Sequence, residues 1–337
     1  MHRGDGEYRY SPAWWLPGGH AQTIWGRFMR GKPRLALRRE VLTAPDGDGL
    51  ELHVLDAPES APRVLLLHGL EGTIRSHYVA PMFENARQRG WGAVLFMHRG
   101  CGDAPNLARR FYHSGETSDL AFLFDALLRR HPDSDWALAG VSLGGNVLLK
   151  WLGELGAGAH PRLRAAAAIS VPFDLEAGSR HIATGFGRVY DSRFLRSLRQ
   201  KALAKLERYP DLFERDRLLR ARSIFEFDDC VTAPVHGFRD AVDYYARSSS
   251  IGFLDRVQVP ALLLSAHDDP FLPPAVLQRV RAIAAGNPAL HLEIVQRGGH
   301  VGFVEGHLPW RARHYAEARA FRFFDAVMEP GTRADYD

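Results

Sequence analysis

A five-residue segment, Gly140-Val141-Ser142-Leu143-Gly144, constrains the fold more than any other part of the chain. The apolar run at 135–139 predicts a buried strand, and the run at 145–152 predicts a helix. Strand, G-x-S-x-G and helix in that order are typical of a nucleophile elbow, a sharp turn that exposes a serine hydroxyl at a helix N-terminus. A Cβ at position 140 or 144 would collide with the neighbouring helix or strand, so glycine is expected there. Ser142 is therefore a candidate nucleophile, and the alternative is a glycine-rich turn whose serine only caps the helix.

Strands and helices alternate along the rest of the chain. Apolar runs of strand length occur at 63–67, 92–97, 165–171, 259–265 and 290–296. Segments with helical spacing occur at 77–89, 117–130, 274–285 and 309–328. Two alternating runs at 35–43 and 50–55, joined by a turn rich in Asp and Gly, predict an antiparallel start. The fold class is therefore α/β, with a doubly wound, mostly parallel sheet and antiparallel N-terminal strands.

The alternation of strands and helices is interrupted once, and this interruption predicts how the chain is divided into parts. The expected parts are an N-terminal apolar clasp at 1–33, a core at 34–171 and 251–328, a helical cap insertion at 172–250, and a C-terminal tail at 329–337. The cap should cover the carboxyl ends of the strands, where open α/β sheets bind ligands. Large apolar side chains should press the clasp onto the core, namely Trp14, Trp15, Ile24, Trp25 and Phe28.

Composition excludes several classes of function. The net charge of the 337 residues is only +4 and no basic tract is present, so we expect no nucleic-acid partner. Two cysteines, Cys101 and Cys230, are too few for a disulfide framework and fit a reducing compartment. The first ten residues lack the apolar core of a signal peptide, and no apolar run is long enough to span a membrane. We therefore expect a cytoplasmic protein without stable membrane insertion, in at most transient contact with a lipid substrate.

A serine nucleophile needs a base and an acid, and the loops after the last two strands offer both. His300 lies in a glycine-rich loop after the final strand, where this architecture holds its base. Asp269 follows the preceding strand and is the preferred acid, with Asp268 as the alternative. The order Ser142, Asp269, His300 is that of an α/β-hydrolase. Three other histidines near loops stay open as candidates, namely His20, His113 and His236.

Backbone N–H groups should complete the site. Leu143 follows the nucleophile, and Leu70 lies in the loop after the strand at 63–67, so these two are the expected oxyanion donors. His300 would take the proton of Ser142, and the hydroxyl oxygen would attack an acyl carbonyl and form an acyl-enzyme that water then releases. No histidine cluster has the spacing of metal ligands, so we expect no metal and no cofactor.

With these residues laid out, the chain resembles the YheT-like branch of the α/β-hydrolases. The resemblance runs over most of the chain and rests on several motifs, namely Trp14–Trp25, His68–Gly72, Arg99–Gly102, Tyr112–Thr117, Glu226–Asp229, Thr232–Phe238, Asp268–Phe271 and Gly298–Phe303. It implies carboxylic-ester hydrolysis of short-chain or lipid-like esters, with Ser142, Asp269 and His300 as a charge-relay triad. The natural substrate is not implied by the family.

Two other functions stay open from the sequence. The same triad could transfer the acyl group to an alcohol or amine, because the sequence does not show what lies beside the acyl-enzyme. A non-catalytic binding protein with the hydrolase fold is disfavoured by the intact triad. The primary expectation is a serine hydrolase for small-molecule esters with short- to medium-chain or lipid-like acyl groups.

Overall fold

The computed structural model describes residues 9–29, 36–103 and 106–328. The predicted tail at 329–337 and the parts of the predicted clasp at 1–8 and 30–33 lie outside the described residues.

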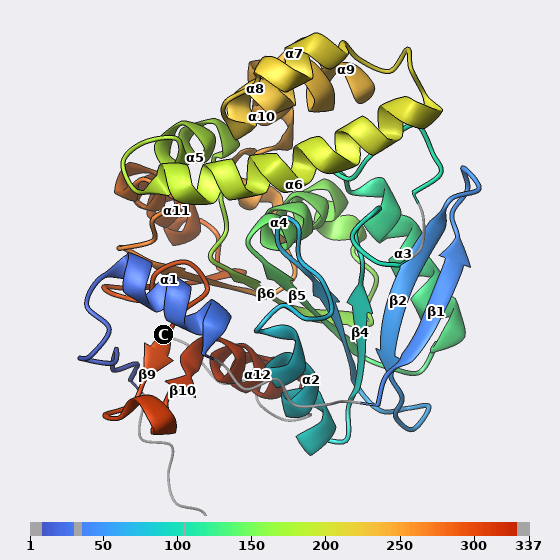
Figure 1. The fold of residues 1–337 in the computed structure, drawn as a ribbon. Coiled ribbons are helices and arrows are strands. Elements are labelled where there is room, and N and C mark those ends of the chain that lie inside the picture. Colours follow the sequence, from blue (N-terminus) through green and yellow to red (C-terminus); the bar gives the residue numbers. More distant parts are fainter. Residues whose placement is uncertain (1–8, 30–35, 104–105, 329–337) are drawn as a thin grey trace, which may run out of the picture.

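An eight-stranded sheet forms the centre of the molecule (Figure 1). Its strands are β1 Arg38–Thr43, β2 Gly49–Leu55, β3 Arg63–Leu67, β4 Gly92–Phe96, β5 Trp136–Val141, β6 Leu163–Ile169, β7 Ala261–Ala266 and β8 Leu290–Val295. Their spatial order is β1-β2-β4-β3-β5-β6-β7-β8. The first two strands pair antiparallel with each other and with β4, and all other pairs are parallel. The predicted mostly parallel sheet with antiparallel N-terminal strands is confirmed.

The sequence of each strand reflects its place in the sheet. The central strands β3, β4, β5 and β7 are buried at every residue, as expected for continuous apolar runs with helices on both faces. The edge strand β1 alternates between exposed and half-buried residues instead. Only small side chains fit where β6 is tightly packed in the sheet. This strand accordingly carries four consecutive alanines, Ala165–Ala168, that are fully buried.

Helices cover both faces of the sheet. They are α2 Val79–Gln88, α3 Ser118–Arg130, α4 Leu143–Leu155, α11 Pro274–Ala285 and α12 Tyr315–Met328. One face holds α2 and α12, which contact each other and the strands β3, β4, β6 and β7. On the other face α4 packs on β5 and β6, and the Phe124 ring of α3 lies edge-on to Trp136 of β5 and Trp151 of α4. This sandwich makes one large apolar core around the sheet.

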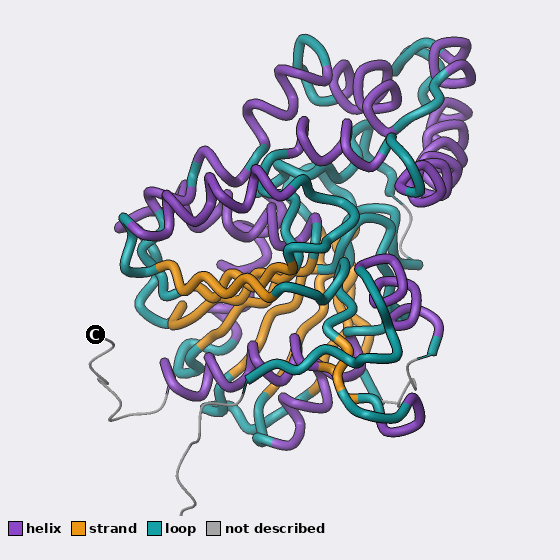
Figure 2. Tube along the Cα trace, turned by 90° about the vertical axis from the view of Figure 1, so that its left-hand side faces the viewer, coloured by secondary structure: helices purple, strands orange, loops and turns teal. Residues whose placement is uncertain are grey.

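The chain between β6 and β7 forms a separate helical layer, which we call the cap helices. They are α5 Leu175–Ile182, α6 Gly187–Arg208, α7 Arg215–Arg220, α8 Ile224–Phe227, a π-helical turn at Asp228–Thr232, α9 Ala233–Val235 and α10 Ala241–Ser248. Three of them begin at side-chain N-caps, Asp174, Ser223 and Asp240. Figure 1 shows this layer above the sheet, and Figure 2 shows it from the side.

The N-terminal segment packs beside the last loops of the core. Helix α1, Gly19–Phe28, follows a short segment in which Ala13 N–H donates to Val304 O at 2.9 Å. The two indole N–H groups of Trp14 and Trp15 donate to carbonyls at 306–307. Trp15 and Trp25 pack edge to face at 4.6 Å, and both pack against the cluster formed by Ala13, Leu16 and Val304.

Three of the apolar side chains do not follow that prediction. Trp14 is 70% exposed, Phe28 is 62% exposed and Ile24 is 39% exposed. The side chains that this segment buries are instead those of Ala13, Leu16 and Gln22, with Trp15 and Trp25 half-buried beside them.

The predicted helix at 309–328 begins later than expected. A short antiparallel pair precedes it, formed by β9 Val304–Glu305 and β10 Arg313–His314, and α12 begins at Tyr315. Pro309 opens a single 3-10 turn instead of the helix. The pairing of β10 with β9 takes the backbone groups that a longer helix would have used.

Candidate active site

Ser142 lies at the turn between β5 and α4, and its backbone is strained as a nucleophile elbow requires. Its φ is 54° and its ψ is −120°, a region that residues with a side chain seldom adopt. A Cβ on Gly140 would lie 2.6 Å from Gly144 O, and one on Gly144 would lie 2.4 Å from Leu67 O. Glycine is thus needed at both positions, because the helix and the strand β3 approach the turn closely.

The three residues predicted as a triad lie in one hydrogen-bonded row. The Ser142 hydroxyl lies 2.9 Å from His300 Nε2, and His300 Nδ1 lies 2.9 Å from Asp269 Oδ2 and 3.1 Å from Oδ1. His300 is 9% exposed and Asp269 is 6% exposed. In this arrangement the imidazole donates from Nδ1 to the carboxylate, which leaves Nε2 free to accept the serine proton.

Asp269 and its neighbours hold the imidazole from two sides. Asp269 Oδ1 also accepts the Phe271 N–H at 2.8 Å, which fixes the carboxylate. The Phe271 ring stacks on the His300 ring with a centroid distance of 4.0 Å and an interplanar angle of 14°. Ring rotation of His300 is therefore limited both in its plane, by the hydrogen bonds, and out of its plane, by the stacked ring.

The neighbouring carboxylate, Asp268, has a different set of partners. Its Oδ1 accepts the backbone N–H groups of Gly298 at 2.8 Å and Gly299 at 2.9 Å. It thus bonds the start of the loop that carries His300, whereas the imidazole itself bonds Asp269. Of the two candidates for the acid, the geometry joins Asp269 to His300.

The loop after β3 brings Leu70 beside the nucleophile. A Cβ on Gly69 would lie 3.1 Å from the Ser142 Cβ, so the loop passes directly over the serine. Within the described part of the chain, the backbone N–H groups of Leu70 and Leu143 form no hydrogen bond. Two such N–H groups near the nucleophile suit the binding of a developing oxyanion.

Two buried histidines, which the sequence did not single out, support this loop. His68 Nδ1 donates to Gly69 O at 2.7 Å, and His68 Nε2 accepts the His98 N–H at 3.1 Å. His98 Nε2 donates in turn to His68 O at 3.2 Å. Burial lowers the pKa of His68 to about 4 and holds the pKa of His98 well below its usual value. Both rings are therefore neutral, and their tautomers are set by the backbone atoms that they bond.

Glu71 links the same loop to the cap helices. It has a φ of 54°, and its N–H donates to the Tyr112 hydroxyl at 3.0 Å. Its carboxylate accepts hydrogen bonds from Tyr112 and from Ser197 of α6, and it forms a 2.7 Å ion pair with Lys201 of the same helix. Helix α6 therefore contacts the residue that directly follows Leu70.

A cavity of about 260 Å³ begins at Leu70 and Leu143 and extends beneath the cap helices. Its walls include the apolar side chains of Phe111, Tyr112, Leu198, Phe227, Val231 and Tyr244. Cationic side chains, among them Lys205 and Arg208, line it as well. Burial lowers the pKa of Lys205 to about 8, and its ammonium donates to two backbone carbonyls. The cavity thus combines an apolar wall with charged groups.

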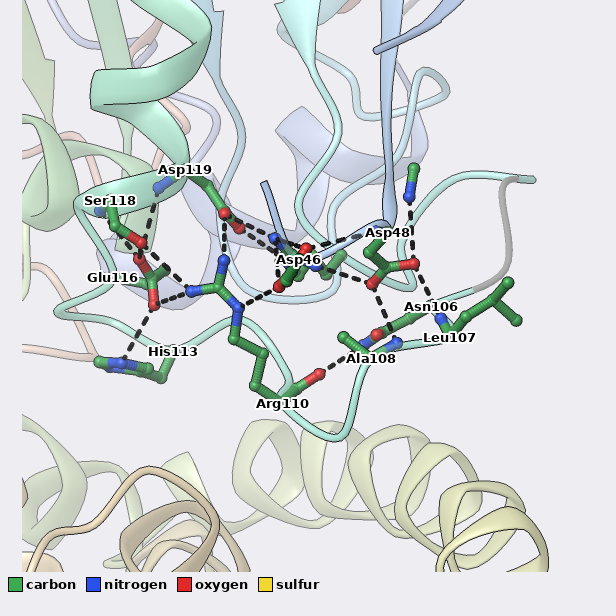
Figure 3. Close-up of polar contacts among 12 residues, drawn as sticks. Asp46, Asp48, Asn106, Leu107, Ala108, Arg110, His113, Glu116, Ser118 and Asp119 are labelled. Carbon is green, nitrogen blue, oxygen red and sulfur yellow. Dashed lines mark hydrogen bonds and ion pairs between the residues drawn. The ribbon is translucent and has the colours of Figure 1, made fainter. Parts of the chain in front are cut away.

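One wall of this cavity is fixed by a network of ion pairs, which Figure 3 shows. Arg110 contacts Asp46 of the β1–β2 turn, Glu116 and Asp119 at distances between 2.7 and 3.1 Å. Beneath it, Arg99 is fully buried between Asp48 and Asp119. The network holds the loop at 106–116, which carries Phe111 and Tyr112 into the cavity.

The other three candidate histidines lie elsewhere. The His20 ring contacts the rings of Phe186, which precedes α6, and of Tyr190 in α6, with centroid distances of 4.7 and 5.8 Å. The rings of His113 and His236 lie 4.4 Å apart, and burial lowers the pKa of His113 to about 3 and that of His236 to about 4. His20 and His113 contact the rings of Tyr190 in α6 and Tyr244 in α10, and His236 contacts the ring of His113. The imidazole bonded to Ser142 is that of His300.

Residues 9–29, 36–103 and 106–328 contain no group of three or more His, Cys, Asp or Glu side chains that could hold a metal ion. The helices in these same ranges are all too short or too polar to cross a bilayer.

Comparison with known proteins gives a consistent family. Residues 62–307 match the family described as alpha/beta hydrolase fold. YheT of Escherichia coli (strain K12), which is named as an esterase, is 38% identical over 86% of this chain and 85% of its own length. Phospholipase ABHD3 of Mus musculus is 31% identical over 96% of this chain and 79% of its own length. Among solved structures, the Pyrococcus furiosus esterase Pf2001 has a TM-score of 0.57 and 16% identity over 89% of this chain and 98% of its own.

Proposed function

Because this chain is a carboxylic ester hydrolase of the α/β-hydrolase family, in its YheT-like branch, we propose that it acts through an acyl-enzyme on Ser142. The observation that carries the proposal is the row of 2.9 Å contacts from the Ser142 hydroxyl through His300 to Asp269. A serine that only capped α4 would need neither the strained backbone nor a buried imidazole within hydrogen-bond distance of its oxygen.

Each residue has a defined part in the proposed mechanism. His300 accepts the Ser142 proton at Nε2 while the hydroxyl oxygen attacks the acyl carbonyl, and Asp269 stabilises the imidazolium that forms. His300 then protonates the leaving alcohol, and afterwards it takes a proton from the water that releases the acyl group. The mechanism needs no metal and no cofactor.

The backbone N–H groups of Leu70 and Leu143 bind the oxyanion in this proposal. Each donor contributes about 3 kcal/mol of transition-state stabilisation at sites of this kind. Neither N–H has another hydrogen-bond partner within the described residues, so both are free for the developing charge.

The proposed substrates are small-molecule esters with short- to medium-chain or lipid-like acyl groups. The cavity of about 260 Å³ that begins at the oxyanion donors supports this, because phenylalanine, tyrosine, leucine and valine side chains line it. We propose further that residues 172–250 act as a cap over a core at 34–171 and 251–328. A cytoplasmic location remains a prediction, and the buried free thiols of Cys101 and Cys230 fit it.

Hydrolysis of p-nitrophenyl esters from C2 to C16 by the wild type and by Ser142→Ala tests the proposal. We expect turnover by the wild type and a loss of roughly 10³-fold or more in the variant, because the attacking oxygen is removed. The preferred chain length then measures the acyl pocket. Equal activity in both proteins would mean that the elbow is only a turn. Should neither protein release nitrophenol, the same esters with an added alcohol distinguish acyl transfer from a binding protein.

A further inference from the structure

The loop that carries His300 is held in a backbone conformation that it would not adopt alone. Three of its residues have positive φ, namely Gly299 at 60°, Val301 at 59° and Phe303 at 41°. Valine is β-branched, so a positive φ is strained at Val301 and persists only where the surroundings enforce it. Ser170 and His77 of the core each bond the backbone of Val301, at 3.0 and 3.1 Å.

The residue at the centre of the loop, His300, has its backbone held by helix α1. Its N–H donates to Thr23 Oγ1 at 2.8 Å. The Thr23 hydroxyl donates its own proton to Gly19 O, four residues earlier in the helix, at 2.7 Å. This bond fixes the rotation of the hydroxyl, so that a lone pair faces the His300 N–H.

A second side chain of α1 bonds the loop at its far end. Gln22 is fully buried, its Oε1 accepts the Val304 N–H at 2.8 Å, and its Nε2 donates to Val304 O at 3.2 Å. The amide therefore bonds both backbone groups of one residue, as a neighbouring strand would. Together, Thr23 and Gln22 hold the loop at His300 and at the point where it enters β9.

Glycines allow the helix and the loop to meet at the backbone. A Cβ on Gly19 would lie 1.8 Å from Asp268 O, and one on Gly302 would lie 2.5 Å from Gln22 O. A Cβ on Gly299 would lie 2.3 Å from Gly19 O and 2.7 Å from Thr23 Oγ1. An apolar segment can cover a core without backbone contacts this close. The contacts at these three glycines therefore make the position of helix α1 relative to the loop specific.

We propose that helix α1 positions the base: Thr23 and Gln22 hold the His300 loop so that the imidazole meets both Ser142 and Asp269. The proposal rests on the proposed function in taking His300 as the base. Thr23 and Gln22 act through the backbone of the loop and are positioning residues. A displacement of the imidazole by about 1 Å lowers the rate on the order of 100-fold at sites of this kind. A loop that holds His300 less firmly should therefore lower kcat.

Thr23→Val and Thr23→Ser form the matched pair that tests this. Valine has nearly the volume of threonine but lacks the hydroxyl, whereas serine keeps the hydroxyl. We expect Thr23→Val to lower kcat roughly tenfold or more with KM nearly unchanged, because the alignment of the base is disturbed rather than the cavity. Thr23→Ser should restore most of the rate. Ile24→Ala, on the exposed side of the same helix, should keep the kcat of the wild type.

Amide hydrogen exchange of the loop at 298–303 gives a readout that does not depend on activity. The loop should exchange faster in Thr23→Val than in the wild type and in Thr23→Ser, and Gln22→Met should show the same increase if Thr23→Val does not fold. Wild-type kcat together with wild-type exchange in Thr23→Val would overturn the proposal. Equal ester turnover by wild type and Ser142→Ala would instead refute the proposed function, and the exchange rates would still decide whether α1 holds the loop.

Discussion

Two adjacent carboxylates, Asp268 and Asp269, have different partners, so their neutral isosteres should differ in effect. Asp269→Asn removes the charge that stabilises the imidazolium and favours the wrong tautomer of His300, so kcat should fall roughly 10³- to 10⁴-fold. Asp268→Asn keeps an oxygen that can accept the two backbone N–H groups at Gly298 and Gly299, so most activity should remain. Ester turnover by both variants, with unfolding midpoints recorded alongside, makes the comparison.

A reversal of that pattern would show that the acid has been assigned to the wrong carboxylate. The sequence alone favours Asp269 without separating the pair, because adjacent residues after one strand both reach the neighbouring loop. What distinguishes them is the direction of each side chain, and that depends on backbone contacts to residues some 30 positions away in the chain. A choice between two adjacent candidate residues such as these therefore requires the three-dimensional structure.

At the scale of elements, helix α6 and the loop after β3 should depend on each other through Glu71 and Lys201. Lys201→Met leaves the Glu71 carboxylate, which is 9% exposed, without its cation, so both kcat and the unfolding temperature should fall. Glu71→Gln with Lys201→Met removes both charges and should recover part of the loss. A double-mutant cycle on kcat and on thermal unfolding measures this coupling. Strictly additive effects would mean that the ion pair does not link the cap helices to the oxyanion loop.

Local sequence patterns predict which helices and strands form, but they do not predict every boundary between them. The elbow and the central strands follow from local pattern, since glycine spacing and continuous apolar runs each leave few alternatives. Pro309 is a local signal for a helix start, but β10 pairs with β9 at this point and α12 begins only at Tyr315. Tertiary pairing overrode a local preference there.

For the whole molecule, four buried histidines predict a steep loss of stability in acid. Burial lowers the pKa of His68 and His236 to about 4 and that of His113 to about 3, and it holds the pKa of His98 well below its usual value. In the unfolded chain these groups bind protons below about pH 6.5, whereas the folded chain leaves them neutral. The contribution of these histidines to stability should therefore be present above about pH 6.5 and be lost as the pH drops toward 4.

Urea unfolding at several pH values between 5 and 7.5 measures this dependence. The slope of the unfolding free energy against pH gives the number of protons taken up on unfolding. His236→Asn should lower that number by about one, because it removes one of the four groups. A stability that does not change between pH 7.5 and 5 would contradict the assignment of neutral, buried imidazoles.

Contacts between the two ends of the chain are the part of the site that sequence reasoning did not reach. The motif around Gln22 and Thr23 stood out in the sequence, but it was interpreted as an apolar clasp on account of its tryptophans. Its polar residues bond backbone groups some 280 positions away, and nothing in the local pattern signals such a contact. Side chains that bond main-chain atoms impose little constraint on the identity of their partners, which is why the sequence carries no matching signal.

The distance along the chain between Thr23 and His300 also has a consequence during protein synthesis. Ribosomes add about 5–20 residues per second, so the 277 residues that follow Thr23 up to His300 take roughly 14–55 s to make. For that time helix α1 has left the ribosome while the loop that it binds does not yet exist. The side chains of Gln22 and Thr23 then lack the backbone groups that they bond in the folded protein, and the nucleophile elbow is complete before its base has been translated. The nascent chain therefore stays inactive until the loop that carries His300 has been made.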